Sequence, residues 1–188
     1  MKHYVIYVPG LGDHHDGRRW LIGRGWQLFG VKMQLVPMQW DSGEAYQQKA
    51  LRLKQAIVSA QQSGYTVSLI GESAGASIAL NVAADTPGIH HIVTLAGVTS
   101  SDLPIWPVTK KRSPSFVVSA SKINDSLKHL DTSRIHTVHA LIDRIVSPRY
   151  NDIVGAHNHQ LLSVGHIPTI VLCLTLFSPF IVSLIKKP

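Results

Sequence analysis

The sequence predicts a single α/β domain over residues 1–188, with a mostly parallel sheet and helices on both of its faces. Three observations predict this class. Short β-branched segments alternate with helix-patterned segments along most of the chain. A serine between two glycines separates one such strand from the helix that follows it. The length of 188 residues and the apolar content of 45% suit one core rather than two.

Six strands are predicted from β-branched or alternating apolar runs. The first, residues 3–8, is stopped by a proline and a glycine, and the second, residues 31–36, is stopped by Pro37. The other four cover residues 66–70, 91–95, 136–142 and 160–164. Because helical patterns separate most of these strands, we expect parallel pairing and βαβ units.

The clearest helix covers residues 44–62, where apolar side chains recur at helical spacing until Ser63 and Gly64 end the pattern. Shorter helices are predicted over residues 18–29, 74–84 and 121–130. The region of about residues 98–134 is long for a plain connection, and we expect a small cap-like insertion there. Residues 167–188 are predicted as an apolar C-terminal helix.

Charge and cysteine content restrict the function classes. The formal net charge is +7, but the basic residues are scattered apart from three short clusters, at residues 18–19, 110–112 and 186–187. No nucleic-acid-binding motif accompanies them, so nucleic acid is not an expected partner. A lone cysteine, Cys173, excludes an intramolecular disulfide. The chain starts with a predicted strand rather than a signal peptide, which favours a cytoplasmic protein, either free or peripheral to a membrane.

The strongest motif is G-x-S-x-G, which reads Gly-Glu-Ser-Ala-Gly at residues 71–75. It stands between the strand at 66–70 and the helix at 74–84, the context in which a serine is presented as a nucleophile on a sharp turn. Small residues two before and two after Ser73 are needed for that turn. The alternative is an ordinary turn with Ser73 as a helix N-cap. Glu72 is expected to face solvent or to bond a loop.

A serine nucleophile needs a base, and the base needs an orienting acid. His166 follows the last predicted strand and is therefore expected at the same sheet edge as Ser73, whereas His157 and His159 precede or begin that strand. Asp143 directly follows the strand at 136–142 and is the predicted acid. Asp152 is the alternative.

The oxyanion of an acyl-transfer intermediate needs two backbone N–H donors. One is expected from Ala74, the residue after the nucleophile. The other is expected from the loop after the first strand, which reads Pro-Gly-Leu-Gly at residues 9–12. Leu11 is the predicted donor, with Gly12 as the alternative.

Together, the glycine loop, the Gly-Glu-Ser-Ala-Gly turn, Asp143 and His166 resemble the α/β-hydrolase superfamily over nearly the whole chain, in particular small uncharacterised bacterial members of serine esterase or lipase type. The resemblance implies a compact α/β-hydrolase fold that lacks the early edge strands, a serine nucleophile and neither metal nor cofactor. Many members have histidine where this chain has Pro9. Because the oxyanion donors are main-chain groups, this departure leaves the mechanism unchanged.

The predicted activity is hydrolysis of a small-molecule acyl ester through an acyl-enzyme. The alternatives are an acyltransferase with the same triad of Ser73, His166 and Asp143, and a non-catalytic binding module on a hydrolase fold. Residues 13–16, Asp-His-His-Asp, suggest metal ligands, but no second signature accompanies them, and a polar loop is the preferred interpretation.

Two segments are predicted to act beyond the triad. Ile105 and Trp106 in the cap-like region are expected to contact the acyl group. In the C-terminal segment, residues 167–177 are expected to pack against the sheet and 179–185 to continue as a partly exposed apolar end. That end is a predicted contact for a membrane surface or a second copy of the chain.

Overall fold

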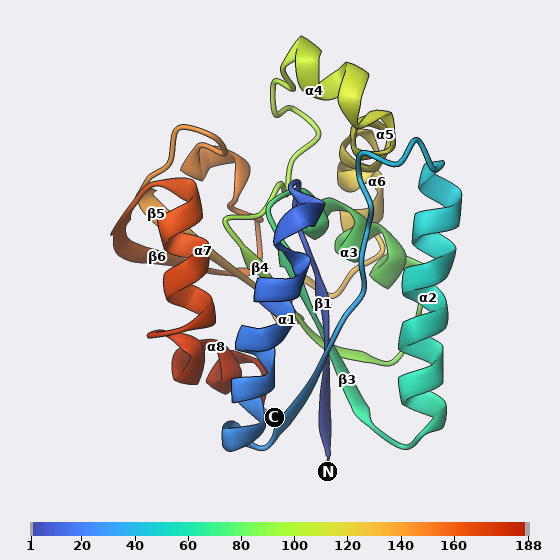
Figure 1. Ribbon diagram of the computed structural model, residues 1–188, viewed down its shortest axis with the longest axis vertical. Coiled ribbons are helices and arrows are strands. Elements are labelled where there is room, and N and C mark those ends of the chain that lie inside the picture. Colours follow the sequence, from blue (N-terminus) through green and yellow to red (C-terminus); the bar gives the residue numbers. More distant parts are fainter. Residues whose placement is uncertain (1, 187–188) are drawn as a thin grey trace.

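The computed structural model describes residues 2–186 and contains one six-stranded sheet in which every strand is parallel to its neighbours (Figure 1). Met1, Lys187 and Pro188, which the predicted domain includes, lie outside the described residues. The strand order is β2-β1-β3-β4-β5-β6. The strands are β1 (His3–Val8), β2 (Val31–Leu35), β3 (Thr66–Glu72), β4 (Ile89–Leu95), β5 (Ile135–Ile142) and β6 (His157–Val164). The predicted fold class is confirmed.

Two helical layers cover the sheet. One contains α2 (Tyr46–Gln62), α3 (Ala74–Ala84), α5 (Pro114–Ser121) and α6 (Ile123–Leu127), whose apolar side chains share a core with alternate residues of the strands. The other contains α1 (Asp16–Arg24), α7 (His166–Leu174) and α8 (Ser178–Ile185), packed on the opposite residues. Figure 1 shows α1 and α7 in front of the sheet.

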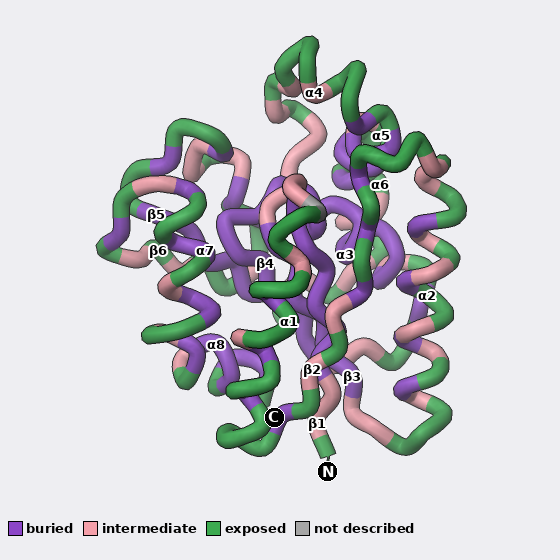
Figure 2. Tube along the Cα trace, in the orientation of Figure 1, coloured by how far each residue is buried: buried purple, intermediate pink, exposed green. Residues whose placement is uncertain are grey.

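Burial on both faces explains why the central strands are almost continuously apolar. Six of the seven residues of β3 are buried, as are the last four of β1. In Figure 2 the buried residues form a continuous central block, while α4 (Pro107–Arg112) projects from it and is exposed. All six strands run toward the same edge, so the loops that follow them gather there.

The cap-like region contains three short helices rather than the one predicted at 121–130. Helices α5 and α6 pack on α3 as part of the main helical layer. Only the stretch that leads into α4, together with α4 itself, lies beyond the carboxyl ends of the strands (Figure 1). The structure thus brings this stretch, with Ile105 and Trp106, to the edge where chemistry is expected.

The C-terminal segment differs from the prediction in two ways. It forms two helices instead of one, because the chain leaves helical geometry at Thr175 and restarts with a proline at the beginning of α8. Residues 179–185 are partly exposed as expected, since Pro179 and Ser183 are exposed, but they do not form a loose apolar end. Ile181, Leu184 and Ile185 are buried in the core, where α8 contacts β4.

No single helix within residues 2–186 is long and apolar enough to cross a bilayer. Helices α7 and α8 meet that criterion of length and composition only when they are taken together, and they are bent by 72°. The contact of the segment with a membrane surface or a second copy stays a prediction.

Candidate active site

Ser73 sits on a strained turn between β3 and α3. Its backbone has φ 49° and ψ −118°, a conformation that a non-glycine residue rarely adopts. Two backbone hydrogen bonds hold the turn: Ser73 N–H donates to the Leu95 carbonyl at 3.0 Å, and Val98 N–H donates to the Ser73 carbonyl at 3.0 Å. The predicted G-x-S-x-G turn therefore presents its serine on a backbone that β4 and the following loop keep in place.

The glycines of the turn are required by close packing. A Cβ on Gly71 would lie 2.5 Å from Ala76 Cα, and a Cβ on Gly75 would lie 2.7 Å from the Pro9 carbonyl oxygen and closer still to that of Val8. Both clashes are with backbone, which cannot move aside as a flexible side chain can. The tight turn thus brings α3 directly against β1 and the loop that follows it.

We therefore expect Gly75→Ala to destabilise the fold by about 2 kcal/mol or more, which lowers Tm by about 4–8 °C. Gly17 on α1 is the matched control, because a Cβ there has no neighbour within 4 Å and alanine favours a helix. Thermal unfolding followed by circular dichroism measures both. A Gly75→Ala protein that melts with the wild type would contradict the close approach of α3 to β1.

The structure brings the predicted base and acid to Ser73. His166 is the first residue of α7, directly after β6, and Asp143 follows β5. His166 Nε2 lies 2.9 Å from Ser73 Oγ, and His166 Nδ1 lies 2.7 Å from Asp143 Oδ2. Both His166 and Asp143 are buried. Ser73, His166 and Asp143 thus form one continuous hydrogen-bonded chain from three different strand ends.

Asp143 is held as a carboxylate. Its Oδ1 accepts hydrogen bonds from the N–H groups of Ile145 (2.8 Å) and Val146 (3.0 Å), while Oδ2 accepts from His166. Burial by itself raises the pKa of Asp143, but the hydrogen bond and charge attraction of His166 and the two backbone donors outweigh burial and lower it. The anion can therefore orient His166 and stabilise its protonated form.

The alternatives considered for acid and base lie elsewhere. Asp152 is half exposed and bonds His139 Nε2 at 3.1 Å. His157 and His159 both belong to β6, which begins three residues earlier than predicted, and His159 Nε2 lies 3.2 Å from His136 Nδ1. None of these contacts involves Ser73.

Leu11 and Ala74, the predicted oxyanion donors, line the same pocket as Ser73. Ala74 is the first residue of α3, so its N–H has no acceptor within the helix. The loop that carries Leu11 is pressed against the nucleophile, because a Cβ on Gly10 would lie 2.8 Å from Ser73 Cβ. Gly12, the alternative donor, has φ 94°.

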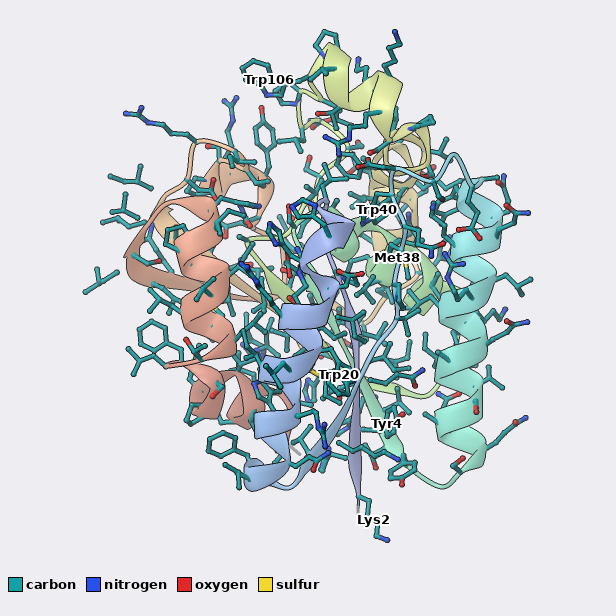
Figure 3. The ribbon with its side chains drawn as sticks, in the orientation of Figure 1. Lys2, Tyr4, Trp20, Met38, Trp40 and Trp106 are labelled. Atoms are coloured by element: carbon teal, nitrogen blue, oxygen red, sulfur yellow. The ribbon has the colours of Figure 1, made fainter. Side chains whose placement is uncertain are left out.

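The pocket above Ser73 has a volume of about 80 Å³ and is mainly apolar. Ile105 and Trp106, the predicted acyl contacts, both line it. Trp106 is 72% exposed and stands at the top of the molecule beside α4 (Figure 3). The pocket is lined by Leu11, Ser73, Ala74, Val98, Leu103, Pro104, Ile105, Trp106, Thr109, Phe116, Ile145 and Val146.

The role expected for Glu72 is partly wrong. Glu72 does not face solvent but is 2% exposed, and it accepts hydrogen bonds from the Tyr7 hydroxyl and from Arg19. Arg19, which the sequence places in a surface basic cluster, is itself buried and also bonds the loop at residues 11–12. The sequence did hold a signal for this buried pair: Glu72 ends a strand that is otherwise mostly apolar, so its charge needs a partner.

Two other sequence features have defined surroundings. Among the residues that the structure describes, no three His, Cys, Asp or Glu side chains are grouped so that they could hold a metal ion. Cys173 is buried on α7, and burial raises the pKa of its thiol to about 12. The thiol therefore stays protonated at neutral pH and is a poor nucleophile.

No protein-family model matches the chain, and no curated protein does. Solved structures do resemble it. A metagenome-derived lipolytic enzyme of the LipS and LipT pair matches with a TM-score of 0.72 at 12% identity, over 96% of this chain and 93% of its own. The α/β-hydrolase enzyme MGS-MChE2, from a sediment metagenome of the Mar Chica lagoon in Morocco, matches with a TM-score of 0.65 at 18% identity, over 99% and 91%.

A monoacylglycerol lipase from Paleococcus ferrophilus is similar with a TM-score of 0.65 at 13% identity, over 97% of this chain and 94% of its own. These identities are too low to transfer an activity, but the likeness covers nearly the whole of each chain. The chain therefore has the α/β-hydrolase fold, as its resemblance to that superfamily implied.

Proposed function

We propose that this protein is a serine hydrolase that cleaves carboxylic esters through an acyl-enzyme on Ser73. The observation that carries the proposal is the hydrogen-bonded chain Asp143–His166–Ser73, with distances of 2.7 and 2.9 Å, whose serine lines a mainly apolar pocket. A neutral imidazole with this geometry accepts the serine proton, and a buried carboxylate holds it in the required tautomer. The esterase and lipase folds among the similar structures agree with this chemistry.

In the first half-reaction Ser73 Oγ attacks the ester carbonyl carbon while His166 Nε2 takes the hydroxyl proton. The carbonyl oxygen becomes an oxyanion, for which the N–H groups of Ala74 and Leu11 are the proposed donors. Collapse of this intermediate breaks the bond between the carbonyl carbon and the alkoxy oxygen. His166 returns its proton to that oxygen, the alcohol leaves, and the acyl group stays on Ser73.

In the second half-reaction a water molecule gives its proton to His166 and attacks the acyl carbon. The bond to Ser73 Oγ then breaks, His166 returns the proton to Ser73, and the carboxylic acid leaves. Every proton passes between Ser73, water or alcohol and one imidazole nitrogen. Ser73, His166 and Asp143 therefore account for every proton transfer in the proposed cycle.

A panel of p-nitrophenyl esters tests the proposal. We expect hydrolysis that follows saturation kinetics and is absent from a Ser73→Ala protein prepared in the same way. Adding primary alcohols and amines and analysing the products separates hydrolysis from acyl transfer: hydrolysis yields free acid regardless of the acceptor, whereas an acyltransferase yields the new ester or amide. A purified wild-type protein that cleaves no ester and transfers no acyl group would favour the binding module instead.

The size of the pocket favours short acyl groups. About 80 Å³ is well below the roughly 300–1,000 Å³ of a typical small-molecule pocket. Phe116, Val98 and Val146 bound this space with apolar walls, so the acyl chain is desolvated there. We expect acetyl to butyryl esters to react faster than esters with long chains.

Replacing Trp106 with alanine is expected to extend the range of acyl chains, because its indole stands at the rim of this pocket. The side chain is mostly exposed, so the free energy of unfolding should change by less than about 0.5 kcal/mol. The measurement is kcat/KM across acyl chains of increasing length. Trp20→Ala on α1 is the control, since Trp20 is also an exposed tryptophan but does not line the pocket. An unchanged chain-length profile in Trp106→Ala would remove Trp106 from substrate recognition.

A further inference from the structure

Arg19 connects two segments that meet at the candidate site, and it does so from the protein interior. Its Nε donates to Glu72 Oε2 at 2.8 Å, and its Nη2 donates to Glu72 Oε1, so the carboxylate is bound by two parallel hydrogen bonds. The Tyr7 hydroxyl donates to the same carboxylate. Arg19 is 8% exposed and Glu72 2%. This is a buried, bidentate pair rather than a surface ion pair.

The remaining donors of Arg19 reach the oxyanion loop, defined here as residues 9–12. Nη1 donates to the Gly12 carbonyl at 2.9 Å and to Asp16 Oδ1 at 2.9 Å, and Nη2 lies 3.5 Å from the Leu11 carbonyl. One guanidinium therefore holds the two loop residues considered as oxyanion donors. It also holds Glu72, the residue that immediately precedes the nucleophile.

Arg19 and Tyr7 keep their protonation states over a wide pH range. Burial by itself lowers the pKa of Arg19, but its hydrogen bonds and charge attraction to Glu72 outweigh burial and raise the pKa. Burial and the neighbouring carboxylate raise the pKa of Tyr7 well above its usual value. Arg19 stays a cation and Tyr7 stays a hydrogen-bond donor throughout the pH range in which an esterase works.

Holding a carbonyl fixes an N–H group. The peptide unit is planar and trans, so the Leu11 carbonyl and the Gly12 N–H point in opposite directions from one rigid plane. Binding of the Leu11 carbonyl by Arg19 thus sets the direction of the Gly12 N–H. The adjoining plane, which carries the Leu11 N–H, shares the Leu11 Cα with this one, so its direction then depends only on the φ and ψ of Leu11.

The rest of the loop is held in the same way. The Trp40 indole N–H donates to the Pro9 carbonyl at 3.0 Å, and Gly10 packs against Ser73 with no space for a side chain. These side-chain contacts act together with two backbone contacts: the His15 N–H donates to the Gly12 carbonyl at 3.0 Å, and Gly75 of α3 packs against Pro9. A developing oxyanion is stabilised only by donors already in place, because moving them during the reaction costs energy.

The pair also has an electrostatic consequence. An unpaired Glu72 carboxylate one residue from Ser73 would repel the negative charge that forms on the substrate oxygen, and repulsion is strong where water is excluded. Arg19 compensates that charge. The glutamate can therefore anchor the arginine without opposing the reaction.

We propose that Arg19, held by Glu72 and Tyr7, is a positioning residue that sets the oxyanion loop against the nucleophile. The inference rests on the proposed function, since it assigns Arg19 a role in stabilising the transition state of that reaction. Arg19 touches no reacting atom in this role. It acts through the backbone of residues 11 and 12.

The test is the double variant Arg19→Gln/Glu72→Gln, which removes both charges of the buried pair together, so that neither is left without the other. Asp16, which is partly exposed, loses its ion pair with Arg19 in this variant. We expect kcat for a short-chain ester to fall about 10- to 100-fold, as for a slightly misplaced oxyanion donor, with KM within about twofold of the wild type. The pH profile should keep its shape, because Arg19 does not belong to the proton path through His166. Arg19→Lys keeps the charge but loses the bidentate geometry, and we expect a smaller fall in kcat, of less than about tenfold.

The matched control is Arg52→Gln/Glu44→Gln. That pair is also bidentate, with distances of 3.0 and 2.7 Å, and Arg52 also contacts a backbone carbonyl, but the contacts of both residues lie away from the pocket. Its kcat should equal that of the wild type. A purely structural role for Arg19 would lower the melting temperature of Arg19→Gln/Glu72→Gln while its kcat stayed equal to that of the control, and that result would overturn the positioning role.

The rate of labelling by a fluorophosphonate separates this inference from the proposed function, because the phosphonyl oxygen enters the oxyanion hole. We expect the Arg19→Gln/Glu72→Gln protein to label about 10- to 100-fold more slowly than the wild type. A double variant that labels and turns over at the wild-type rate overturns the positioning role alone. If the double variant does not fold, a wild-type kcat in Arg19→Lys would likewise overturn the positioning role. A wild-type protein that never labels overturns the proposed function and this inference with it.

Discussion

Replacing Ser73 with alanine is expected to lower kcat/KM for ester hydrolysis by about 10⁵- to 10⁶-fold. Alanine removes the hydroxyl oxygen that lies 2.9 Å from His166 Nε2, so no acyl-enzyme can form on residue 73. The substitution deletes one hydroxyl and keeps the two backbone hydrogen bonds that join residue 73 to Leu95 and Val98. The remaining rate would come from the oxyanion donors and the pocket alone.

Steady-state kinetics with a p-nitrophenyl ester, at enzyme concentrations high enough to measure the residual rate, checks this expectation. Ser121→Ala is the control, because Ser121 lies at the end of α5 and bonds only the Val118 carbonyl there. The control should retain wild-type kinetics. A Ser73→Ala protein with more than a few per cent of wild-type activity would show that another group performs the chemistry.

Asp143→Asn should cost about 10⁴-fold in kcat while the protein stays folded. The amide has nearly the size of the carboxylate but cannot stabilise a protonated His166, and it favours the wrong imidazole tautomer. Asp152→Asn is the matched control, since the structure pairs Asp152 with His139 instead. Equal losses in the two variants would reopen the choice of acid.

The same variant should also change how stability depends on pH. The pKa of Asp143 is lowered in the folded protein, so its ionised form stabilises the fold above the unfolded pKa of about 4 and this contribution is lost as the pH falls through the folded value. Asparagine does not titrate. The stability gap between wild type and Asp143→Asn should therefore be largest near neutral pH and shrink in acid, which urea titrations at several pH values measure.

The sequence predicted the elements that place the chemistry because their signals are local. The strand at residues 3–8 and the helix at 74–84 have the predicted bounds. Asp143 and His166 were found because parallel strands deliver the residues after them to one edge, so chain order alone puts three side chains within reach. The prediction of these two residues used only the positions of the strand ends and the chain order serine, acid, histidine.

The contacts of Glu72 with Tyr7 and Arg19 were not predicted, because they depend on which face of the sheet the last side chain of a strand points to. Glu72 is the last residue of β3, and its side chain lies on the face covered by α1, where Tyr7 and Arg19 reach it. An arginine beside another arginine on a short helix usually indicates a solvated surface, and only the tertiary position of α1 shows that Arg19 is buried. Local pattern cannot specify a partner 53 residues away.

The C-terminal prediction failed for a different reason. An apolar run without charges predicts burial but not the direction in which the chain continues. The turn at Thr175–Phe177 bends α8 by 72° from α7, so that it lies under β4. The bend buries Ile181 and Ile185 in the same core as Val93. A straight continuation of α7 would have left these apolar side chains exposed to water.

Mass spectrometry of the wild-type protein after treatment with a fluorophosphonate tests directly whether Ser73 is the nucleophile. We expect one phosphonyl adduct per chain, mapped by peptide sequencing to Ser73 in the segment Gly71–Gly75, and no adduct in Ser73→Ala. We also expect prior incubation with a short-chain ester to slow the labelling. An adduct on another residue, or a folded wild-type protein that acquires none, would contradict a nucleophilic Ser73.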